Sequence, residues 1–245
     1  MTPGVDHVAP VVPSVEAASD VAAVASLDEP IRRRIYYHVR AHAVRVSRDD
    51  VAVALGVPRR TAAFHLDRLA EQGLLAVSFA RRTGRSGPGA GRPAKLYERS
   101  LREVSVSLPP RHYALAGRLL AGAVVEAQQS GEPPRDVLDR RARDFGRAMA
   151  GEKSGEKSGE VEGGTRVLMD LLEDHGYEPQ AAGDDIELRN CPFHAIAQEH
   201  TDLVCGMNLQ LLEGVLAGLG TTGLHACLAP GPSRCCVRLE RSDQA

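Results

Sequence analysis

Two short helices joined by a tight turn are the feature that most restricts what this chain can fold into. Ser47 precedes Asp49 and Asp50, so its hydroxyl can cap the start of a helix whose positive end both carboxylates favour. Gly56 suits the left-handed end of that helix, and Pro58 suits the first turn of the next one. The sequence therefore predicts a helix-turn-helix arrangement.

The second helix of this pair is predicted over residues 58–72 and has one apolar face. Ala62, Leu66 and Leu69 are spaced i, i+4 and i+7, which places them on the same side of a helix. An earlier predicted helix adds apolar side chains to the same core: Ile31, Ile35, Tyr36 and Val39. We therefore expect a compact three-helix core at the start of the chain.

Charge is distributed unevenly along the 245 residues, whose net charge is −2. Residues 31–100 carry 15 Arg and Lys side chains against 5 Asp and Glu side chains, and the remainder carries 15 against 27. One basic segment on an otherwise acidic chain predicts one domain for a polyanion and a second domain for a different task.

A segment rich in Gly and Arg, residues 81–93, lies between two short stretches that are predicted to be strands, residues 74–79 and 95–99. Two strands around such a tip form a wing. Glycine allows close approach to a phosphate backbone, and arginine supplies contacts to phosphates or to the minor groove. The helices and the wing together indicate a domain that binds double-stranded DNA.

The candidate DNA contacts lie on the exposed side of the second helix and on the wing. Arg59 and Arg60 stand at the helix N-terminus, where recognition helices touch bases or phosphates. Phe64 either packs in the core or contacts a thymine methyl group, and His65 either packs or contacts a phosphate. The full candidate set is Arg59, Arg60, Thr61, Ala63, Phe64, His65, Arg68, Arg81, Arg82, Arg85, Arg92 and Lys95. The alternative for each arginine is a solvated surface position.

Two motifs carry a family resemblance. Residues 56–75 read GxPxxTAxxHLxxLxxxGLL, and residues 91–97 read GRPAKLY. With these motifs the chain resembles the ArsR-like winged helix-turn-helix regulators, and within them the subgroup that contains the SufR-type iron–sulfur repressors. The resemblance covers residues 28–240 and is weakest across residues 130–165. It implies a transcriptional repressor that binds an inverted-repeat operator as a homodimer.

The cysteines gather in the last quarter of the chain, at Cys191, Cys205, Cys227, Cys235 and Cys236, and His194 and His200 lie among them. Soft and borderline ligands clustered in a cytosolic chain indicate a metal site. No CxxC pair occurs, so the spacing matches no zinc finger or ribbon. Adjacent Cys235 and Cys236 are predicted to lie in a strand over residues 235–240 and to point to opposite faces, so that only one of them would bind a given ion.

The resemblance to the SufR-type proteins extends into this region. It rests on Asn190-Cys191-Pro192-Phe193, on Cys205 after thirteen intervening residues, and on Cys-x-x-x-Leu at residues 235–239. It implies an iron–sulfur cluster, [4Fe–4S], on Cys191, Cys205 and Cys235. The fourth ligand is left open among His194, His200, Cys227 and Cys236. In this scheme, oxidation, nitric oxide or iron shortage removes the cluster and releases the DNA.

The same cysteine pattern is compatible with four alternatives to a cluster. The cysteines could bind Zn²⁺ or another single ion, act as a thiol redox switch, or simply be buried around a core or an organic effector pocket. Cys191 with His194 or His200 could form a nucleophile–base pair, but no oxyanion or phosphate loop accompanies it, so we expect no enzyme. An apolar stripe is assigned to the core or to a dimer interface: Leu203, Met207, Leu211, Val215 and Leu219.

The expected fold class is α+β. No apolar run reaches the length of about 18 residues that a membrane span requires, and the first residues lack a secretory signal, so we expect a cytoplasmic protein. The expected divisions are a disordered arm over 1–25, a winged helix-turn-helix domain over 26–102, a helical linker and dimerisation region over 103–163 with a flexible GEKS repeat at 151–160, and a Cys/His-rich sensor domain over 164–245.

Overall fold

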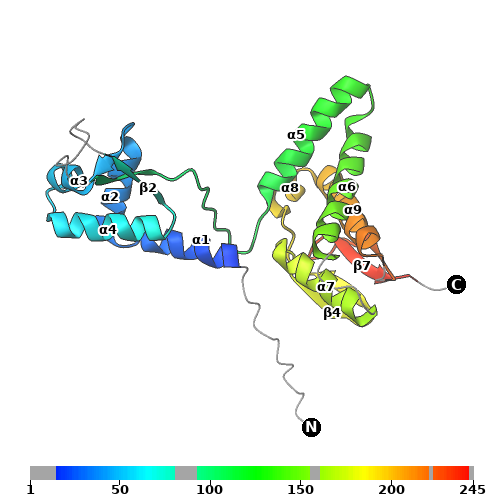
Figure 1. Cartoon of the computed structure of the whole chain (residues 1–245). Coiled ribbons are helices and arrows are strands. Elements are labelled where there is room, and N and C mark those ends of the chain that lie inside the picture. The colour runs from blue at the N-terminus through cyan, green and yellow to red at the C-terminus, as the bar shows by residue number, and fades with distance from the viewer. Residues whose placement is uncertain (1–14, 81–92, 155–160, 221–222, 243–245) are drawn as a thin grey trace, which may run out of the picture. The chain divides into compact units, whose positions relative to one another are not determined.

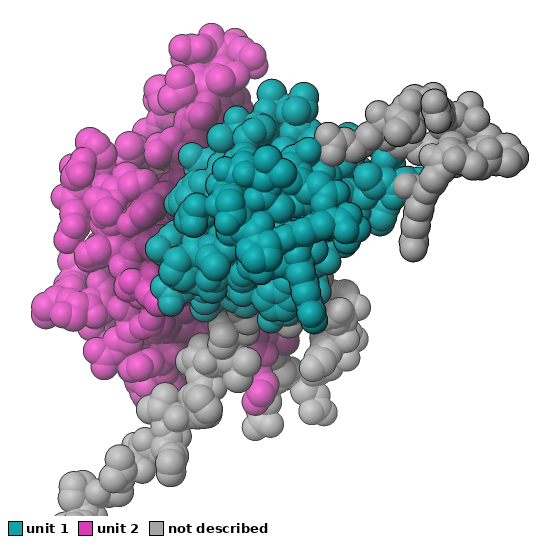
Figure 2. All heavy atoms as spheres, turned by 90° about the vertical axis from the view of Figure 1, so that its left-hand side faces the viewer, with its two compact units in different colours: residues 1–106 teal, residues 107–245 magenta. Residues whose placement is uncertain are grey.

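The computed structural model describes residues 15–80, 93–154, 161–220 and 223–242 (Figure 1). The chain divides into two compact units, Met1–Val106 and Ser107–Ala245, which Figure 2 colours separately. Each unit combines helices with one antiparallel sheet, so the expected mixture of helix and sheet in an α+β protein is confirmed.

Unit 1 has four helices and three strands in its described part. In chain order they are α1 (Val15–Ser26), α2 (Pro30–Ala41), β1 (Val46–Ser47), α3 (Arg48–Leu55), α4 (Arg59–Glu71), β2 (Leu75–Ala80) and β3 (Ala94–Arg99). The strands form one antiparallel sheet in the order β1-β3-β2, in which Tyr97 of β3 lies opposite both Val46 and Val77. Strand β3 is therefore the central strand of this sheet, paired on both sides.

Local sequence signals fix the turn between α3 and α4. Ser47 and Asp50 form the expected capping box, in which the serine hydroxyl accepts from the Asp50 N–H and the aspartate accepts from the Ser47 N–H. Gly56 ends α3 at φ 64°, a left-handed conformation that favours glycine. The predicted stripe on α4 is also confirmed, because Ala62, Leu66 and Leu69 are fully buried.

Helix α1 overturns the expectation that the arm is disordered as far as residue 25. Its Ala23 is fully buried and joins the core around Ile35, and its Asp20 pairs with Arg102 at 2.5 Å. Alanine has a high helix propensity, and packing against the rest of unit 1 stabilises the helix. The segment lacks apolar periodicity, which is why its sequence did not predict a helix. Residues 1–14 of the expected arm lie outside the described residues.

Unit 2 has five helices and four strands in its described part. They are α5 (Tyr113–Ser130), α6 (Pro134–Ser154), α7 (Val161–Asp174), β4 (Pro179–Ala182), β5 (Asp185–Leu188), α8 (His194–Glu199), α9 (Thr201–Leu219), β6 (Leu224–Leu228) and β7 (Val237–Arg241). The sheet order is β4-β5-β7-β6, antiparallel throughout. Helix α9 contacts α6, β6 and β7, and thus forms the centre of the unit (Figure 1).

Helices α6 and α9 approach each other at two glycines. A Cβ added to Gly214 of α9 would lie 2.0 Å from the carbonyl oxygen of Arg143, and one added to Gly146 of α6 would lie 2.0 Å from that of Leu211. Such distances leave no room for a methyl group. Close packing of the two helices therefore requires glycine at both positions.

Helix α9 is long and apolar enough to span a membrane by length and composition, although half of that stretch is buried inside unit 2. Its apolar stripe packs in the core as expected, because Met207, Leu211 and Val215 are buried and Leu203 and Leu219 pack against them. Burial within the unit accounts for the apolar character of this helix.

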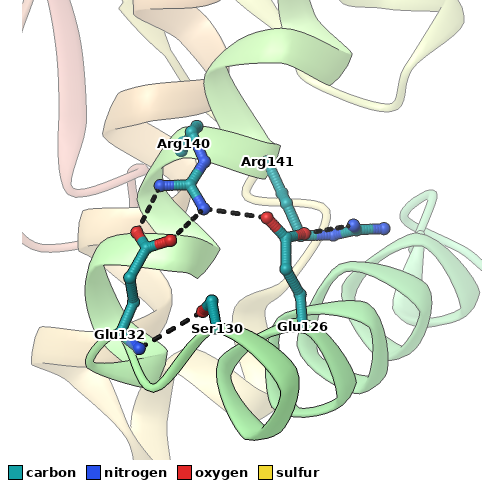
Figure 3. Close-up of polar contacts among 5 residues, drawn as sticks. All are labelled: Glu126, Ser130, Glu132, Arg140 and Arg141. Carbon is teal, nitrogen blue, oxygen red and sulfur yellow. Dashed lines mark hydrogen bonds and ion pairs between the residues drawn. The ribbon is translucent and has the colours of Figure 1, made fainter.

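Arg140 closes the hairpin of α5 and α6 by bonding both Glu126 and Glu132, at 2.8 and 2.7 Å (Figure 3). Arg141 bonds the second oxygen of Glu126 at 2.8 Å. Helix α6 continues to Ser154, so the first residues of the GEKS repeat are helical rather than a flexible linker. Residues 155–160 lie outside the described ranges.

Candidate functional site

The exposed side of α4 presents an aromatic ring and a cation near the start of the helix. The Phe64 side chain is 61% exposed, so its packing in the core, one of the two alternatives, is wrong. Arg60 is exposed, whereas Thr61 and Ala63 are half-buried. Phe79 on the neighbouring strand β2 is also exposed, at 68%. Arg60 and Phe64 therefore lie on the solvent-facing side of α4, where another molecule can reach them.

Arg59, the first residue of α4, is held by α3. Its Nε and Nη2 atoms both bond the carboxylate of Asp49. The hydrogen bond from Arg59 lowers the pKa of Asp49 and keeps the carboxylate ionised. The positive charge of Arg59 is therefore compensated locally, whereas Arg60 has no ion-pair partner within the described ranges.

Two further predicted DNA contacts have internal partners. Lys95 of β3 pairs with Asp67 of α4 at 2.5 Å, and the Tyr97 hydroxyl donates to the same Asp67 oxygen at 2.7 Å. Burial raises the pKa of Tyr97, which therefore remains a neutral donor. Arg68 pairs with Glu71 at 2.9 Å. Lys95 thus connects the sheet to α4, an internal role that the sequence pattern did not indicate.

His65 lies in the core of unit 1 rather than on the exposed side of α4. It is 7% exposed, and its Nδ1 lies 3.5 Å from a carboxylate oxygen of Glu29 at the N-cap of α2. Burial lowers the pKa of His65. Of the two alternatives for His65, packing in the core is therefore confirmed. The phosphate contact is wrong, because the ring is buried and DNA cannot reach it. Four predicted wing contacts lie outside the described residues: Arg81, Arg82, Arg85 and Arg92.

In unit 2 the structure brings together four cysteines from three separate segments. The Sγ atoms of Cys205 and Cys236 lie 2.7 Å apart, and the thiols of Cys191 and Cys235 share a hydrogen bond. Cys205 lies on α9, Cys191 lies in the loop before α8, and the other two precede β7. All five cysteines of the chain are free of disulfides.

The prediction that Cys235 and Cys236 point to opposite faces of a strand is wrong. Strand β7 begins only at Val237, so the two cysteines lie in the turn before it. Alternation between the faces of a sheet does not apply to a turn. The two thiols make separate contacts, Cys235 with Cys191 and Cys236 with Cys205.

The other candidate ligands lie apart from these thiols. His194 and His200 are exposed at the two ends of α8, and neither has a side-chain hydrogen bond or ion pair within the described ranges. Cys227 lies on β6, where a hydrogen bond with Glu240 adds to burial in raising its pKa. Of the four residues considered as a fourth ligand, only Cys236 contacts one of the other three cysteines.

The four thiols stand as two contacting pairs. In the part of the chain that the structure describes, no group of three or more His, Cys, Asp and Glu side chains is placed so that it could hold one ion without adjustment. A shared centre would therefore require the two pairs to move together. The two pairs lie near each other, because the charge of Cys191 contributes to the raised pKa of Cys205.

The surroundings of the sulfurs fit metal-bound cysteine. Cys235 Sγ accepts from Asn208 Nδ2 at 3.3 Å and from the Val237 N–H at 3.5 Å, and the sulfur of Cys191 accepts from the Phe193 N–H. Hydrogen bonds of this kind to sulfur tune iron–sulfur clusters and orient metal ligands. The chemistry of the donor set, four soft thiols in a largely buried site, suits the same groups.

The pKa shifts describe how the thiols differ before any metal binds. The hydrogen bond with Cys235 lowers the pKa of Cys191, and the positive charge of Arg111 acts in the same direction. Burial and the contact with Cys236 raise the pKa of Cys205 to about 12. Cys191 therefore ionises more readily than Cys205.

The loop that carries Cys191 is bonded to the segment at the start of unit 2. The His112 N–H donates to Pro192 O at 3.0 Å, and Arg111 Nη1 donates to Cys191 O at 3.1 Å. Asn190 Nδ2 donates to Pro110 O at 2.9 Å. Sequence reasoning noted Asn190 only as part of a motif and missed Arg111, because these contacts join residues about 80 positions apart.

Comparison of the chain with protein-family models, curated proteins and solved structures finds no match.

Proposed function

We propose that the protein is a DNA-binding transcriptional repressor in which unit 1 is a winged helix-turn-helix domain and unit 2 senses redox or iron status through a metal centre. The observation that carries the DNA-binding role is the order of elements α2-β1-α3-α4-β2-β3, with α4 exposing Arg60 and Phe64. A helix pair followed by a two-stranded antiparallel ribbon supports this assignment.

Helix α4 is the proposed recognition helix. Its N-terminal residues would enter the major groove, with Arg60 on bases or phosphates and Phe64 on a thymine methyl group. The chain would act as a homodimer on an inverted repeat, since two recognition helices about 34–36 Å apart reach successive turns of one DNA face. Residues 81–92, which carry four arginines and lie outside the described residues, are proposed to contact DNA as well.

The proposed metal centre is an iron–sulfur cluster on Cys191, Cys205 and Cys235, with Cys236 as the fourth ligand. Support comes from the four gathered thiols and from the N–H donors to Cys191 and Cys235. When bound, a cluster supplies sensitivity to oxidants, because its oxidation destroys it. The cysteines would hold the cluster as thiolates, and the reducing cytoplasm would keep the remaining thiols free.

Residues 110–112 are the proposed connection between sensing and DNA binding. Their bonds to Asn190, Cys191 and Pro192 fix the ligand loop to the segment that leads back along the chain to unit 1. Metal loss would release that loop and, through the segment, alter how the two recognition helices are held. A coupling of about 1–3 kcal/mol would change DNA affinity about 5–150-fold.

A single Zn²⁺ ion is the second candidate for the centre. The four thiols of Cys191, Cys205, Cys235 and Cys236 supply the Cys₄ donor set that structural zinc sites use. The sulfurs of Cys205 and Cys236, 2.7 Å apart, would have to separate on binding, because Zn–S bonds of about 2.3 Å in a tetrahedral site place two sulfurs about 3.8 Å apart. A Cys₄ zinc site would be structural and would leave DNA binding insensitive to mild oxidants. Metal content separates the two candidates.

The test is anaerobic purification of the full chain, followed by analysis of iron, sulfide and zinc. We expect iron and acid-labile sulfide in the parent protein and in Cys227→Ser, the matched control, because Cys227 does not contact the other four cysteines. Cys205→Ser and Cys236→Ser should each lose most of the metal. A parent protein that contains neither iron nor zinc, or a Cys236→Ser variant with full content, contradicts the proposed centre.

A further inference from the structure

A buried amide bridges a tyrosine and one of the four gathered thiols. Asn208 lies in the middle of the apolar helix α9 and is 1% exposed, which is unusual for this residue type. The Tyr177 hydroxyl donates to its Oδ1, and its Nδ2 donates to Cys235 Sγ at 3.3 Å. Tyr177, at 2% exposure, is buried as well.

The sulfur of Cys235 thereby becomes a double acceptor. Besides the Asn208 amide, the backbone N–H of Val237 points to it at 3.5 Å. A neutral thiol is a weak acceptor, whereas a sulfur that carries negative charge accepts strongly. The hydrogen bond that a buried amide donates to a sulfur atom is therefore strongest when that sulfur is charged or bound to a metal.

We infer that Tyr177 and Asn208 form a hydrogen-bond relay that positions Cys235 as a metal ligand and stabilises the negative charge on its metal-bound sulfur. This inference rests on the proposed metal centre and adds two positioning residues to it. The bond that Tyr177 donates to the Asn208 carbonyl polarises the amide and strengthens the N–H that meets the sulfur.

The relay also connects two parts of the centre. Asn208 lies three residues after Cys205 on α9, so one helix carries both a ligand and the donor to another ligand. Tyr177 follows α7, in a different part of the fold. Asn208 therefore holds the turn that carries Cys235 in register with the helix that carries Cys205.

A purely structural role would be to satisfy the buried tyrosine hydroxyl. Removal of one partner of a buried hydrogen bond leaves the other unsatisfied, whereas replacement of both by apolar groups can be nearly neutral. The double variant Tyr177→Phe/Asn208→Leu removes both partners and the donor to Cys235 together. It should preserve the fold and still lack the relay. A weaker metal affinity in this variant would therefore come from the lost donor to Cys235 and not from an unsatisfied tyrosine hydroxyl.

The experiment uses the full chain, prepared free of metal and titrated with Zn²⁺ in competition with a chromophoric chelator. Loss of an outer-shell partner weakens metal affinity about 10–100-fold, and we expect a loss in this range for Asn208→Leu and for the double variant. Tyr177→Phe should lose less, because its amide donor remains. Gln210→Leu on the same helix, whose amide accepts from Arg143 instead, is the matched control and should bind like the parent.

A second readout is the reduction potential of the iron–sulfur-loaded protein. Loss of the N–H bond to Cys235 should shift the midpoint to more negative values in the double variant, because that bond stabilises the more negative, reduced centre. A double variant with parent affinity and parent potential overturns the relay and leaves the proposed centre intact. A parent protein that takes up neither iron nor Zn²⁺ contradicts both.

Discussion

Asp49 of α3 holds Arg59, the first residue of α4, through two hydrogen bonds, whereas the adjacent Arg60 is exposed. The two neighbouring arginines therefore differ in the charge they can offer to the proposed DNA partner. We expect Arg60→Ala to weaken binding to duplex DNA more than Arg59→Ala does.

Salt dependence measures this difference directly. Each phosphate neutralised contributes about one unit to the slope of log affinity against log salt concentration, so Arg60→Ala should reduce that slope by about 1. The slope for Arg59→Ala should stay closer to that of the parent protein. Equal slopes for both variants would mean that the Asp49 pair does not distinguish the two arginines. Fluorescence anisotropy at several salt concentrations provides the values.

A substitution at Phe64 should affect DNA binding without affecting the stability of the fold. Because its ring is 61% exposed, Phe64→Ala should change the free energy of unfolding little while it weakens binding to duplex DNA. Leu66, two residues further along α4, is fully buried, and Leu66→Ala should cost about 2–5 kcal/mol of stability. Urea unfolding of both variants checks the contrast. A large loss of stability in Phe64→Ala would contradict the assigned orientation of α4.

The buried His65 predicts a pH dependence of stability. Burial lowers its pKa in the folded state, whereas the unfolded chain takes up the proton near its ordinary pKa of about 6.5. The unfolded state therefore binds more protons as the pH falls below that value, and the folded state loses stability. Thermal unfolding between pH 7.5 and 5.5 should show a steeper loss for the parent than for His65→Gln. Parallel curves for the two proteins would exclude His65 as the source.

The approach of α6 to α9 predicts that Gly214 tolerates no side chain. Gly214→Ala should destabilise unit 2 by at least about 1–3 kcal/mol, the usual cost of overpacking, because its Cβ would meet the carbonyl of Arg143. Gly117 of α5 is the matched control. An added Cβ there meets nothing within 4 Å, so Gly117→Ala should stabilise by about 0.5–1 kcal/mol. Chemical denaturation that ranks the two variants in the opposite order would refute the packing.

Local rules in the sequence predicted much of unit 1. The Ser47 cap, the Gly56 helix end and the apolar face of α4 are each set by residues within about one helical turn, so short-range reasoning is sufficient. Helix α1 escaped prediction because its stabilisation comes from distant partners. Its Asp20 pairs with Arg102, and its Ala23 joins a core that the sequence pattern does not reveal.

In unit 2 the sequence pointed to Cys191, Cys205 and Cys235, but the paired arrangement could not be derived from it. Whether Cys236 takes part depends on where β7 begins, and strand ends are the least certain feature of a sequence-based assignment. Asn208 carried a signal, a lone polar residue within an apolar stripe, although its partners on other segments become apparent only in the fold.

The central claim is that the cysteine centre of unit 2 controls DNA binding by unit 1. Its most direct test is the affinity of one anaerobic preparation, before and after metal removal by a chelator, for a duplex that the metal-loaded protein selects from a random library. We predict that metal removal weakens this affinity at least about fivefold, the lower end of ordinary allosteric coupling. The same affinity before and after removal, in a preparation whose metal loss is verified by analysis, would contradict the account.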